Sequence, residues 1–531
     1  MRKVLFTIVV FAFAFFAQES PKTKTVQGEF PKGTTDSQSF VIENEDVIFP
    51  FDNKGVIGDV QGAGVKFDSL GVIYSAGFAV SGYTDAALWA NAVITSSRLK
   101  DYIPGNVGDS EGGEIYVVRS SDPPFGESWQ IWSEAVNKGA KFYDGDGDGV
   151  YNPVDLNGNG VWDATEDAPD LAGDVVAWCV YNDGVPAEQR TFTDMQPQGI
   201  EIRQTVWTNL TIPELQNVFF IRYSLYNTGS VAESFSDVYF SIITDADIGN
   251  YADDLAGSKP SLETAYTYGR GEDALFGESI PTVMTTFLGA VKSINGEKIV
   301  YDDYNNSFIQ YMQSHPVLGD PNNAVELRNL MLGKKNNGDF VDPCSWEYGE
   351  VFNNDCSTID GRWMYSGNPI DSIGWLNTFP TDQRTMFNIG PFDINSGESI
   401  DITVAYHFSR GETGLQSVAL GLAKAEYLIS HAGILGIDDR DETPKEFSLS
   451  QNYPNPFNPT TTIKYAVPKT SLITLKIYDV LGREIETLVN NVQNPGIYSV
   501  QFDAAKLSSG VYFYTLQAGD FVITKKMILA K

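Results

Sequence analysis

The sequence predicts a mainly β protein: a large β-sandwich-type module with a few helices, followed by a small C-terminal β-sandwich. Three observations support this fold class. Apolar residues alternate with polar ones over many short segments, and turn signals separate those segments. The 531 residues also include 32 Phe, 26 Tyr and 49 Gly, with only 20% charged residues. This composition is typical of a globular β protein and excludes a disordered chain.

The N-terminus has the order of a signal peptide. Arg2 and Lys3 precede an apolar run over residues 4–16, and a small residue follows. The run is shorter than the roughly 20 residues that a membrane-spanning helix needs. We therefore predict a signal peptide over residues 1–17, with a buried N-terminal strand as the alternative, and an extended segment over residues 18–56. No later stretch is long and apolar enough to cross a membrane, so the mature chain is predicted to have no transmembrane segment.

Residues 57–435 are predicted to form one large β-rich unit. Apolar and polar side chains alternate over Phe219–Leu225 and again over Val238–Ile242, which is the two-residue period of half-buried strands. The turn signal Asn227–Ser230 lies between these strands. Further strands are predicted at Glu114–Arg119, Glu201–Asn209, Thr282–Val291 and Ser399–Phe408.

Two helices interrupt this β pattern. A shorter one is predicted at Ala324–Leu332, and a longer one follows from five apolar residues that share one helical face. These five residues are Leu415, Val418, Leu422, Ala425 and Ile429. Many strands with few helices favour a β-sandwich assembly over an α/β enzyme.

The chain contains three cysteines. Cys344 and Cys356 lie 12 residues apart in a segment rich in Asn, Asp and Gly, and an exported protein can join such a pair in a disulfide. Cys179 lies in an apolar run and is predicted to pack as a small buried hydrophobe.

The formal net charge is −33, and the acidic excess is uneven along the chain. Residues 446–531 contain eight Lys and Arg against six Asp and Glu, so the excess lies upstream of them. An acidic surface repels nucleic acid and anionic lipid, and it suits a protein surrounded by divalent cations. We therefore expect no nucleic-acid partner.

A linker is predicted over residues 436–446, where the chain is charged and has no apolar periodicity. Short strands follow at close spacing, separated by turns that contain Gly. They are predicted at Thr462–Val467, Ile473–Tyr478, Tyr498–Phe502, Val511–Gln517 and Phe521–Leu529. This pattern predicts a small, separate immunoglobulin-like β-sandwich over residues 447–531.

The C-terminal segment carries several motifs in order. It opens with Asn452–Pro459, continues through Ile477–Arg483 and Leu507–Phe513, and ends in the basic strand Lys525–Leu529. In these motifs residues 447–531 resemble the type A sorting domain of the type IX secretion system. The resemblance implies that the signal peptide directs export across the inner membrane and that the type IX machinery, as a partner of this domain, carries the protein across the outer membrane. The expected location is extracellular or the outer-membrane surface.

The sharpest chemical signal is a pair of twelve-residue acidic loops, Asp144–Asp155 and Asp155–Glu166. Each has oxygen ligands at positions 1, 3 and 5, Gly at position 6, a backbone carbonyl at position 7 and a carboxylate at position 12, the ligand order of an EF-hand calcium loop. In this register Asp155 closes the first loop and opens the second, and the alternative is an acidic solvated turn. The predicted Ca²⁺ ligands are Asp144, Asp146, Asp148, Val150, Asp155, Asn157, Asn159, Val161, Asp163 and Glu166.

Pro153 and the Gly-rich steps forbid the flanking helices of a sensor EF-hand. The loops instead resemble the tandem calcium loops of dockerin and thrombospondin type 3 repeats. We predict a structural role for Ca²⁺, because carboxylates crowded into one short segment repel one another without it.

A second acidic cluster, formed by Asp245, Asp247 and Asp253, lies where a predicted strand passes into a loop. Two interpretations are open. The three carboxylates can bind a further Ca²⁺, or they belong to a polar loop held by Asx turns.

Enzyme motifs find little support in the sequence. Gly108–Gly112 has the Gly-x-Ser-x-Gly spacing of a hydrolase elbow, but a turn suits its surroundings better than the strand and helix that the elbow needs. The histidines, His315, His407 and His431, are widely separated and form no zinc pair. A Ser-His-Asp triad or a glycosidase carboxylate pair stays open, because its members need not be adjacent in sequence. No catalytic or cofactor-binding residue is predicted.

Residues 57–435 also resemble a recurrent, uncharacterised class of large extracellular modules that precede this sorting domain. The shared features are Asp144–Glu166, Gly173 and Asp174 with Trp178, Asp245–Gly257, Gly367 with Gly374 and Trp375, and Gly390–Phe392. This resemblance implies architecture and location only.

Three hypotheses of function follow. The first is a non-enzymatic, calcium-stabilised surface or adhesion protein that assembles with itself or binds a surface glycan. The second is a glycan-binding module or a glycan-active secreted enzyme, in which Trp129, Trp132, Trp346, Trp363 and Trp375 stack on sugars instead of packing in the core. The third is a secreted hydrolase that uses Ser110 or another nucleophile near a histidine.

Overall fold

The structure is a computed structural model, and the predicted signal peptide and linker lie outside the residues that it describes. It describes residues 38–60, 64–93, 101–109, 113–294, 297–301, 305–432, 447–449, 452, 455, 457–468, 471–493, 496–519 and 521–530.

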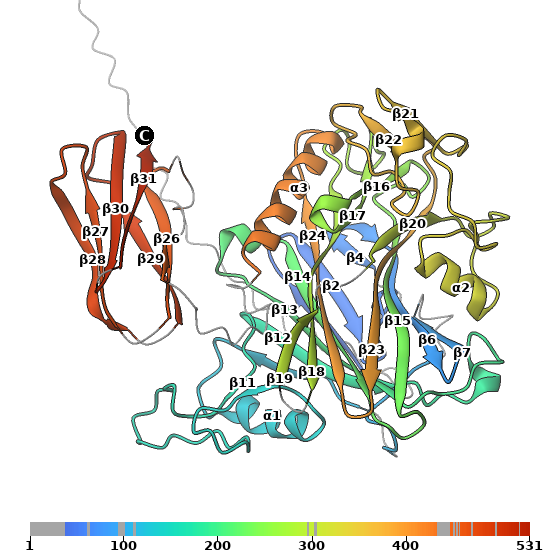
Figure 1. Ribbon diagram of the computed structural model, residues 1–531, viewed down its shortest axis with the longest axis horizontal. Helices are drawn as coiled ribbons and strands as arrows, with labels where there is room; N and C mark the ends of the chain where they lie inside the picture. The colour runs from blue at the N-terminus through green and yellow to red at the C-terminus, as the bar shows by residue number, and fades with distance from the viewer. Residues whose placement is uncertain are drawn as a thin grey trace, which may run out of the picture.

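Two large antiparallel sheets form the first part of the described chain, which is mainly β as the sequence predicted (Figure 1). The strands of the first sheet, in spatial order, are β20 (Ser307–Tyr311), β23 (Gln383–Asn395), β15 (Ser234–Ala246), β6 (Ser75–Thr84), β3 (Ile57–Gly58), β2 (Val47–Asp52), β4 (Val65–Phe67) and β5 (Leu70–Ile73). Two more strands extend it: β1 (Ser39–Glu43) pairs with β2, and β7 (Ala87–Val93) pairs with β6.

The second sheet is also antiparallel and draws its strands from residues 103–409. In spatial order they are β16 (Asp254–Lys259), β17 (Thr264–Gly269), β18 (Thr282–Ile294), β24 (Ser399–Ser409), β14 (Val218–Asn227), β13 (Ile200–Thr208), β12 (Val175–Asn182) and β8 (Ile103–Pro104). In addition β19 (Glu297–Tyr301) pairs with β18, and β9 (Tyr116–Arg119) pairs with β12. The turn at Asn227–Ser230 therefore leads from one sheet to the other, since β14 belongs to the second sheet and β15 to the first.

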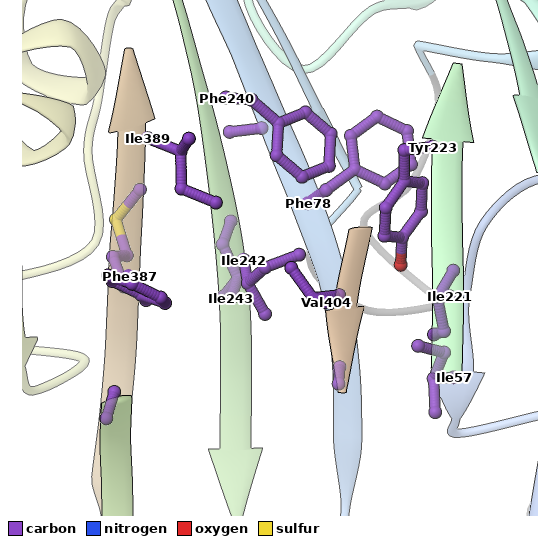
Figure 2. Packing of buried hydrophobic residues seen from close by; sticks show 14 of the residues in the cluster. Ile57, Phe78, Ile221, Tyr223, Phe240, Ile242, Ile243, Phe387, Ile389 and Val404 are labelled. Atoms are coloured by element: carbon purple, nitrogen blue, oxygen red, sulfur yellow. The ribbon is translucent and has the colours of Figure 1, made fainter. Parts of the chain in front are cut away.

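Aromatic side chains join the inner faces of the two sheets. Phe49 of β2 stacks on Phe219 of β14, with ring centroids 4.6 Å apart. Figure 2 shows Phe78 and Phe240 of the first sheet beside Tyr223 of the second, at centroid distances of 5.4 Å and 4.9 Å from the Tyr223 ring. All five rings are fully buried. Because burial of one aromatic side chain contributes roughly 1.5–3 kcal/mol, this layer holds the sandwich together.

The outer face of the second sheet is covered as well. Helix α1 (Glu127–Asn137) contacts β9, and its Trp129 and Trp132 are buried in one cluster with Trp178 of β12, Trp207 and Phe220. Helix α3 (Gly414–Ser430) covers β17 and β18 (Figure 1). Strand β12 is therefore buried along nearly its whole length, without the exposed face of a surface strand.

The predicted helices are present, and one more was missed. Helix α2 (Ala324–Met331) and α3 lie where the apolar spacing placed them. The predicted apolar face of α3 is slightly rotated, because Leu428 is buried and Ile429 is 37% exposed. Helix α1 was not predicted, although its two tryptophans have helical spacing. Within the described residues, no helix has both the length and the apolar character to cross a bilayer.

A small sandwich follows at the C-terminus. One sheet contains β25 (Ser448–Leu449), β26 (Thr460–Val467) and β29 (Gly496–Asp503), and the other contains β28 (Glu484–Gln493), β27 (Ser471–Tyr478), β30 (Gly510–Ala518) and β31 (Phe521–Leu529). The core between them includes Phe457, Ile463, Leu475, Tyr514 and Leu529. The predicted strands are all present, and β25 and β28 are additional.

His407 is a buried polar residue of β24. Its Nε2 lies 2.9 Å from Thr286 Oγ1, and its Nδ1 is buried with no hydrogen-bond partner within the residues that the structure describes. Burial, together with the positive charge of Lys424, lowers the pKa of His407 from 6.5 to about 3. The imidazole is therefore neutral in the folded protein.

We expect His407 to make the fold sensitive to acid. Between pH 6.5 and about 3, the unfolded chain binds a proton at this residue and the folded chain does not, so stability falls as the pH falls, by at most about 1.4 kcal/mol per pH unit. Urea unfolding of wild type and His407→Gln, measured from about pH 7 down to about pH 4.5, should give curves that converge at lower pH. Parallel curves would contradict the assignment.

Candidate metal sites

The two acidic loops form one continuous segment, called the excursion here, which begins and ends at a short pair of antiparallel strands. Strands β10 (Phe142–Tyr143) and β11 (Ala168–Pro169) pair in antiparallel register, and residues 144–167 lie between them. The excursion follows α1 directly in the chain. Tyr151 fastens it to that helix, because its hydroxyl donates to the Trp129 carbonyl at 2.9 Å.

The two loops share one hydrogen-bond scaffold at their first positions. In the first loop, Asp144 accepts from the N–H groups of Gly147 (2.8 Å) and Gly149 (3.0 Å). In the second, Asp155 accepts from Gly158 (2.6 Å) and Gly160 (2.7 Å), the same positions of the loop. These hydrogen bonds, that of Gly160 foremost, lower the pKa of Asp155.

The side chains at positions 3 and 5 also repeat between the loops. Each accepts from the backbone N–H two residues further along the chain. In the first loop these bonds are Asp148 N–H to Asp146 (3.1 Å) and Val150 N–H to Asp148 (2.7 Å). In the second they are Asn159 N–H to Asn157 (3.0 Å) and Val161 N–H to Asn159 (2.7 Å). Gly149 and Gly160, at position 6, have φ of 77° and 75°, a conformation that favours glycine.

The closing carboxylates are neighbours in sequence. Glu166 accepts from the N–H groups at positions 2 and 9 of the second loop, Leu156 (2.7 Å) and Asp163 (3.1 Å). Asp167 accepts from positions 2 and 9 of the first loop, Gly145 (3.0 Å) and Asn152 (2.7 Å). The side chains of Glu166 and Asp167 thus close the second and the first loop respectively.

The hydrogen bonds of Asp155 lie within the second loop, although the twelve-residue register also gave it the last position of the first. Its carboxylate is engaged by the second loop, and the oxygens of Asp167 lie within 4.8 Å of those of Asp144 and Asp146. Asp167 lies outside the first twelve-residue window, so loop spacing alone did not predict it. The β10–β11 ladder brings it back to the start of that loop.

Aromatic residues at position 8 fix both loops to β10. Tyr151 packs edge-on against Phe142, and Trp162 packs edge-on against Tyr143, at centroid distances of 5.3 Å and 5.5 Å. The Trp162 indole N–H also donates to the carbonyl of Glu166 at 2.9 Å. Both loops are therefore attached to the same strand by equivalent aromatic contacts.

The oxygens gathered at the two loops are hard ligands. Carboxylates, amide oxygens and backbone carbonyls are the donors that Ca²⁺ prefers, six to eight at a time. The donor set fits such an ion, with Asp167 added to the predicted ligands of the first loop. No thiol or imidazole belongs to the predicted ligand set or to its closing residues.

The second acidic cluster forms where β15 ends and β23 begins. Carboxylate oxygens of Asp245, Asp247 and Asp382 lie within 4.8 Å of one another. The antiparallel register explains this approach, because Asp245 is opposite Arg384 and the next residue along β15 is opposite Gln383. Asp253, the predicted third member, instead accepts a hydrogen bond from the Asn250 side chain at 2.9 Å.

Burial disfavours the charged form of the carboxylates in this cluster. It raises the pKa of Asp245 to about 7 and that of Asp247 to about 6, and the Asp382 carboxylate adds to both shifts. Burial also raises the pKa of Asp254, which follows Asp253 in the chain. Arg384 opposes the shifts of Asp245 and Asp247, and its Nε lies 3.3 Å from Asp245 Oδ2.

Cys344 and Cys356 are joined in a disulfide, with Cα atoms 5.1 Å apart. An open depression of about 400 Å³ lies beside it and is lined by residues that include Val341, Asp342 and Arg362. Cys179 is buried and free, and burial raises the pKa of its thiol. The thiol thus stays protonated, as suits the small buried hydrophobe that the sequence predicted.

The remaining residues of the enzyme hypotheses have local partners. His315 Nδ1 accepts from the Leu318 N–H at 3.0 Å, and His431 stacks on Tyr427 with centroids 4.1 Å apart. Ser110 lies outside the described residues. Four of the five candidate sugar-stacking tryptophans are buried in the core, namely Trp129, Trp132, Trp363 and Trp375.

Residues 451–530 match the secretion system C-terminal sorting domain family. No curated protein matches the chain. Among solved structures, a polysaccharide lyase aligns over 62% of this chain and 34% of its own, at 9% identity and a TM-score of 0.18. The dimeric latent PorU from Porphyromonas gingivalis aligns over 67% of this chain and 31% of its own, at 9% identity and a TM-score of 0.15. The chain spans about a third of each of these structures. Scores this low carry no argument about fold or function.

We expect the disulfide to contribute to stability. A bridge that closes a loop of this length restricts the unfolded chain and is worth about 2–3 kcal/mol. The double variant Cys344→Ser/Cys356→Ser should therefore melt at a lower temperature than the oxidised wild type. Dithiothreitol should lower the melting temperature of the wild type to that of the variant and leave the variant unchanged. Equal melting temperatures before reduction would contradict the prediction.

Proposed function

We propose that this chain is a secreted or cell-surface structural or adhesion protein whose upstream module is stabilised by Ca²⁺. One observation carries the location: the sorting domain over residues 451–530, which indicates export by type IX secretion. Contact of this domain with the type IX machinery follows from the same match. The role of the cargo rests on the upstream residues.

The repeated scaffold of the two loops supports the calcium part of the proposal. Glu166 and Asp167 are 1% and 2% exposed, although both are acids. A buried carboxylate needs a compensating charge or several hydrogen bonds. Here the backbone supplies two N–H donors to each, and a cation in each loop supplies the positive charge. The excursion is also hydrogen-bonded to α1 through Tyr151, so the ions stabilise the outer layer of the second sheet.

The placement of the histidines supports a non-enzymatic role. His407 is inaccessible to a substrate because its side chain is fully buried. His315 and His431 are engaged by neighbours on their own segments. A hydrolase with a Ser-His-Asp triad needs a histidine that reaches both a nucleophile and the solvent.

A group of aromatic residues favours a second candidate function, glycan binding. Trp346 and Tyr348 are partly exposed and pack edge-on, with centroids 5.3 Å apart. Phe379, which is 49% exposed, lies 4.8 Å from the Tyr348 ring. Exposed aromatic faces of this kind can stack on sugar rings.

We expect the loops to bind two Ca²⁺ ions that respond to different substitutions. Asp167→Asn should remove the ion of the first loop and Asp155→Asn that of the second, one ion per chain in each case. Calcium content after dialysis measures this, and saturation at 100 times Kd should add about 2.7 kcal/mol of stability per site. Asp194→Asn, an exposed control, should change nothing.

Two results would contradict this assignment. If Asp155→Asn loses both ions and Asp167→Asn keeps both, Asp155 is a ligand of both loops, as the twelve-residue register predicted. Calcium content unchanged in both variants would remove the loops as calcium sites.

We expect the secreted protein to assemble in a calcium-dependent way. Negative-stain microscopy with Ca²⁺ and after chelation measures this, and ordered filaments or sheets that disperse on chelation are the expected result. Monomers in both conditions would contradict self-assembly. A glycan array then tests the second function, for which Phe379→Ala should lose binding and the equally exposed Phe340→Ala should not.

A further inference from the structure

Three carboxylates far apart in sequence meet at one edge of the first sheet. Asp245 is the next-to-last residue of β15, Asp247 follows that strand, and Asp382 directly precedes β23. Their oxygens lie within 4.8 Å of one another. This site is separate from the loops over residues 144–167 and does not depend on their function.

The oxygens of this site have fewer donors than buried oxygens require. Asp382 Oδ1 is buried and has no hydrogen-bond partner among the described residues. Asp254 is completely buried and close enough to Asp247 for their charges to interact. Its Oδ2 accepts from the Ile248 N–H at 3.0 Å, but its Oδ1 has no hydrogen-bond partner in the described part of the chain. A buried acceptor without a donor costs about 1–3 kcal/mol, and more when it is charged.

The positive charge beside the site is already shared. Arg384 Nε lies 3.3 Å from Asp245 Oδ2, and its Nη1 donates to Asp320 Oδ1 at 3.0 Å. One guanidinium thus faces two carboxylates before Asp247 and Asp382 are counted. Like charges at this separation repel strongly in a buried setting.

We propose that Asp245, Asp247 and Asp382 bind one divalent cation of the calcium class. All three supply hard carboxylate oxygens, which suits Ca²⁺ and disfavours metals that prefer thiol or imidazole ligands. The side chain of Asp245 is 7% exposed, whereas Asp247 and Asp382 are partly exposed, so the site is closed towards the sheet and accessible to water from outside.

The cation would hold a short connecting segment, called the strap here, against the first sheet. Residues 378–382 run from β22 (Gly374–Asn377) to β23, and the Thr381 N–H donates to the Asp254 carbonyl at 3.1 Å. The Gln383 side chain donates to the same carbonyl at 2.9 Å. Phe379 lies on this strap. The metal would therefore hold in place the segment that carries an exposed ring of the aromatic group.

The test uses the full secreted chain and its calcium content after dialysis against about 1 mM free Ca²⁺, a concentration at which extracellular calcium modules bind. In the background Glu166→Gln/Asp167→Asn, which disables both loops, the protein should retain one Ca²⁺ per chain. Adding Asp382→Asn should remove that ion and abolish the remaining calcium-dependent rise in melting temperature. Asp85→Asn, in the exposed turn between β6 and β7, is the matched control and should keep the ion.

The outcomes separate this site from the loops. A wild type that binds one ion, lost in Asp382→Asn, would support this site and contradict the loops. No ion in the loop-disabled background would overturn the site. Unchanged calcium content in Asp382→Asn, together with higher stability of that variant without metal, would also overturn the site. In that case the three carboxylates are held together by shared protons and not by a cation. Equal binding of Mg²⁺ would overturn the calcium class. If Asp382→Asn fails to fold, Asp247→Asn replaces it under the same criteria.

Discussion

Burial of the second sheet on both faces constrains much of this structure. The side chains of β12 show this most clearly. Ala177, Cys179 and Tyr181 point into the core between the sheets, whereas Trp178 and Val180 belong to the outer cluster. A Trp on the outer face needs an apolar cover. Helix α1 provides that cover, and the acidic excursion is anchored to α1 through Tyr151, so the position of the loops follows from a packing requirement.

The alternation of apolar and polar residues was enough to predict most strands, since it depends only on local sequence. It could not assign strands to sheets. The strands β14 and β15 are consecutive and joined by a short turn, yet they belong to different sheets, and their pairing depends on strands far away in the chain. Strand β28 was missed for another reason. Much of it is exposed, and its composition is polar, so it carries little periodic signal.

The candidate sites divide in the same way. The internal scaffold of each loop is local, and positions 1, 3, 5 and 6 could be placed from spacing alone. The closing carboxylate of the first loop is not local, because the β10–β11 ladder decides that Asp167 returns to Gly145. Asp382 lies still further from its partners in sequence, and only the register of β15 with β23 brings it to Asp247. Sequence spacing describes a loop well and a junction between strands poorly.

The nesting of the two loops has a consequence for how this segment could have arisen. Residues 144–154 supply the first eleven positions of the outer loop, and Asp167 supplies the twelfth. The inner loop, residues 155–166, is therefore a complete twelve-residue unit inserted before the last ligand of the outer one. Excision of that unit would leave a contiguous loop with its closing carboxylate in register. A segment built in this way can gain or lose one whole twelve-residue loop by duplication or deletion, while the β10–β11 strand pair stays at its two ends.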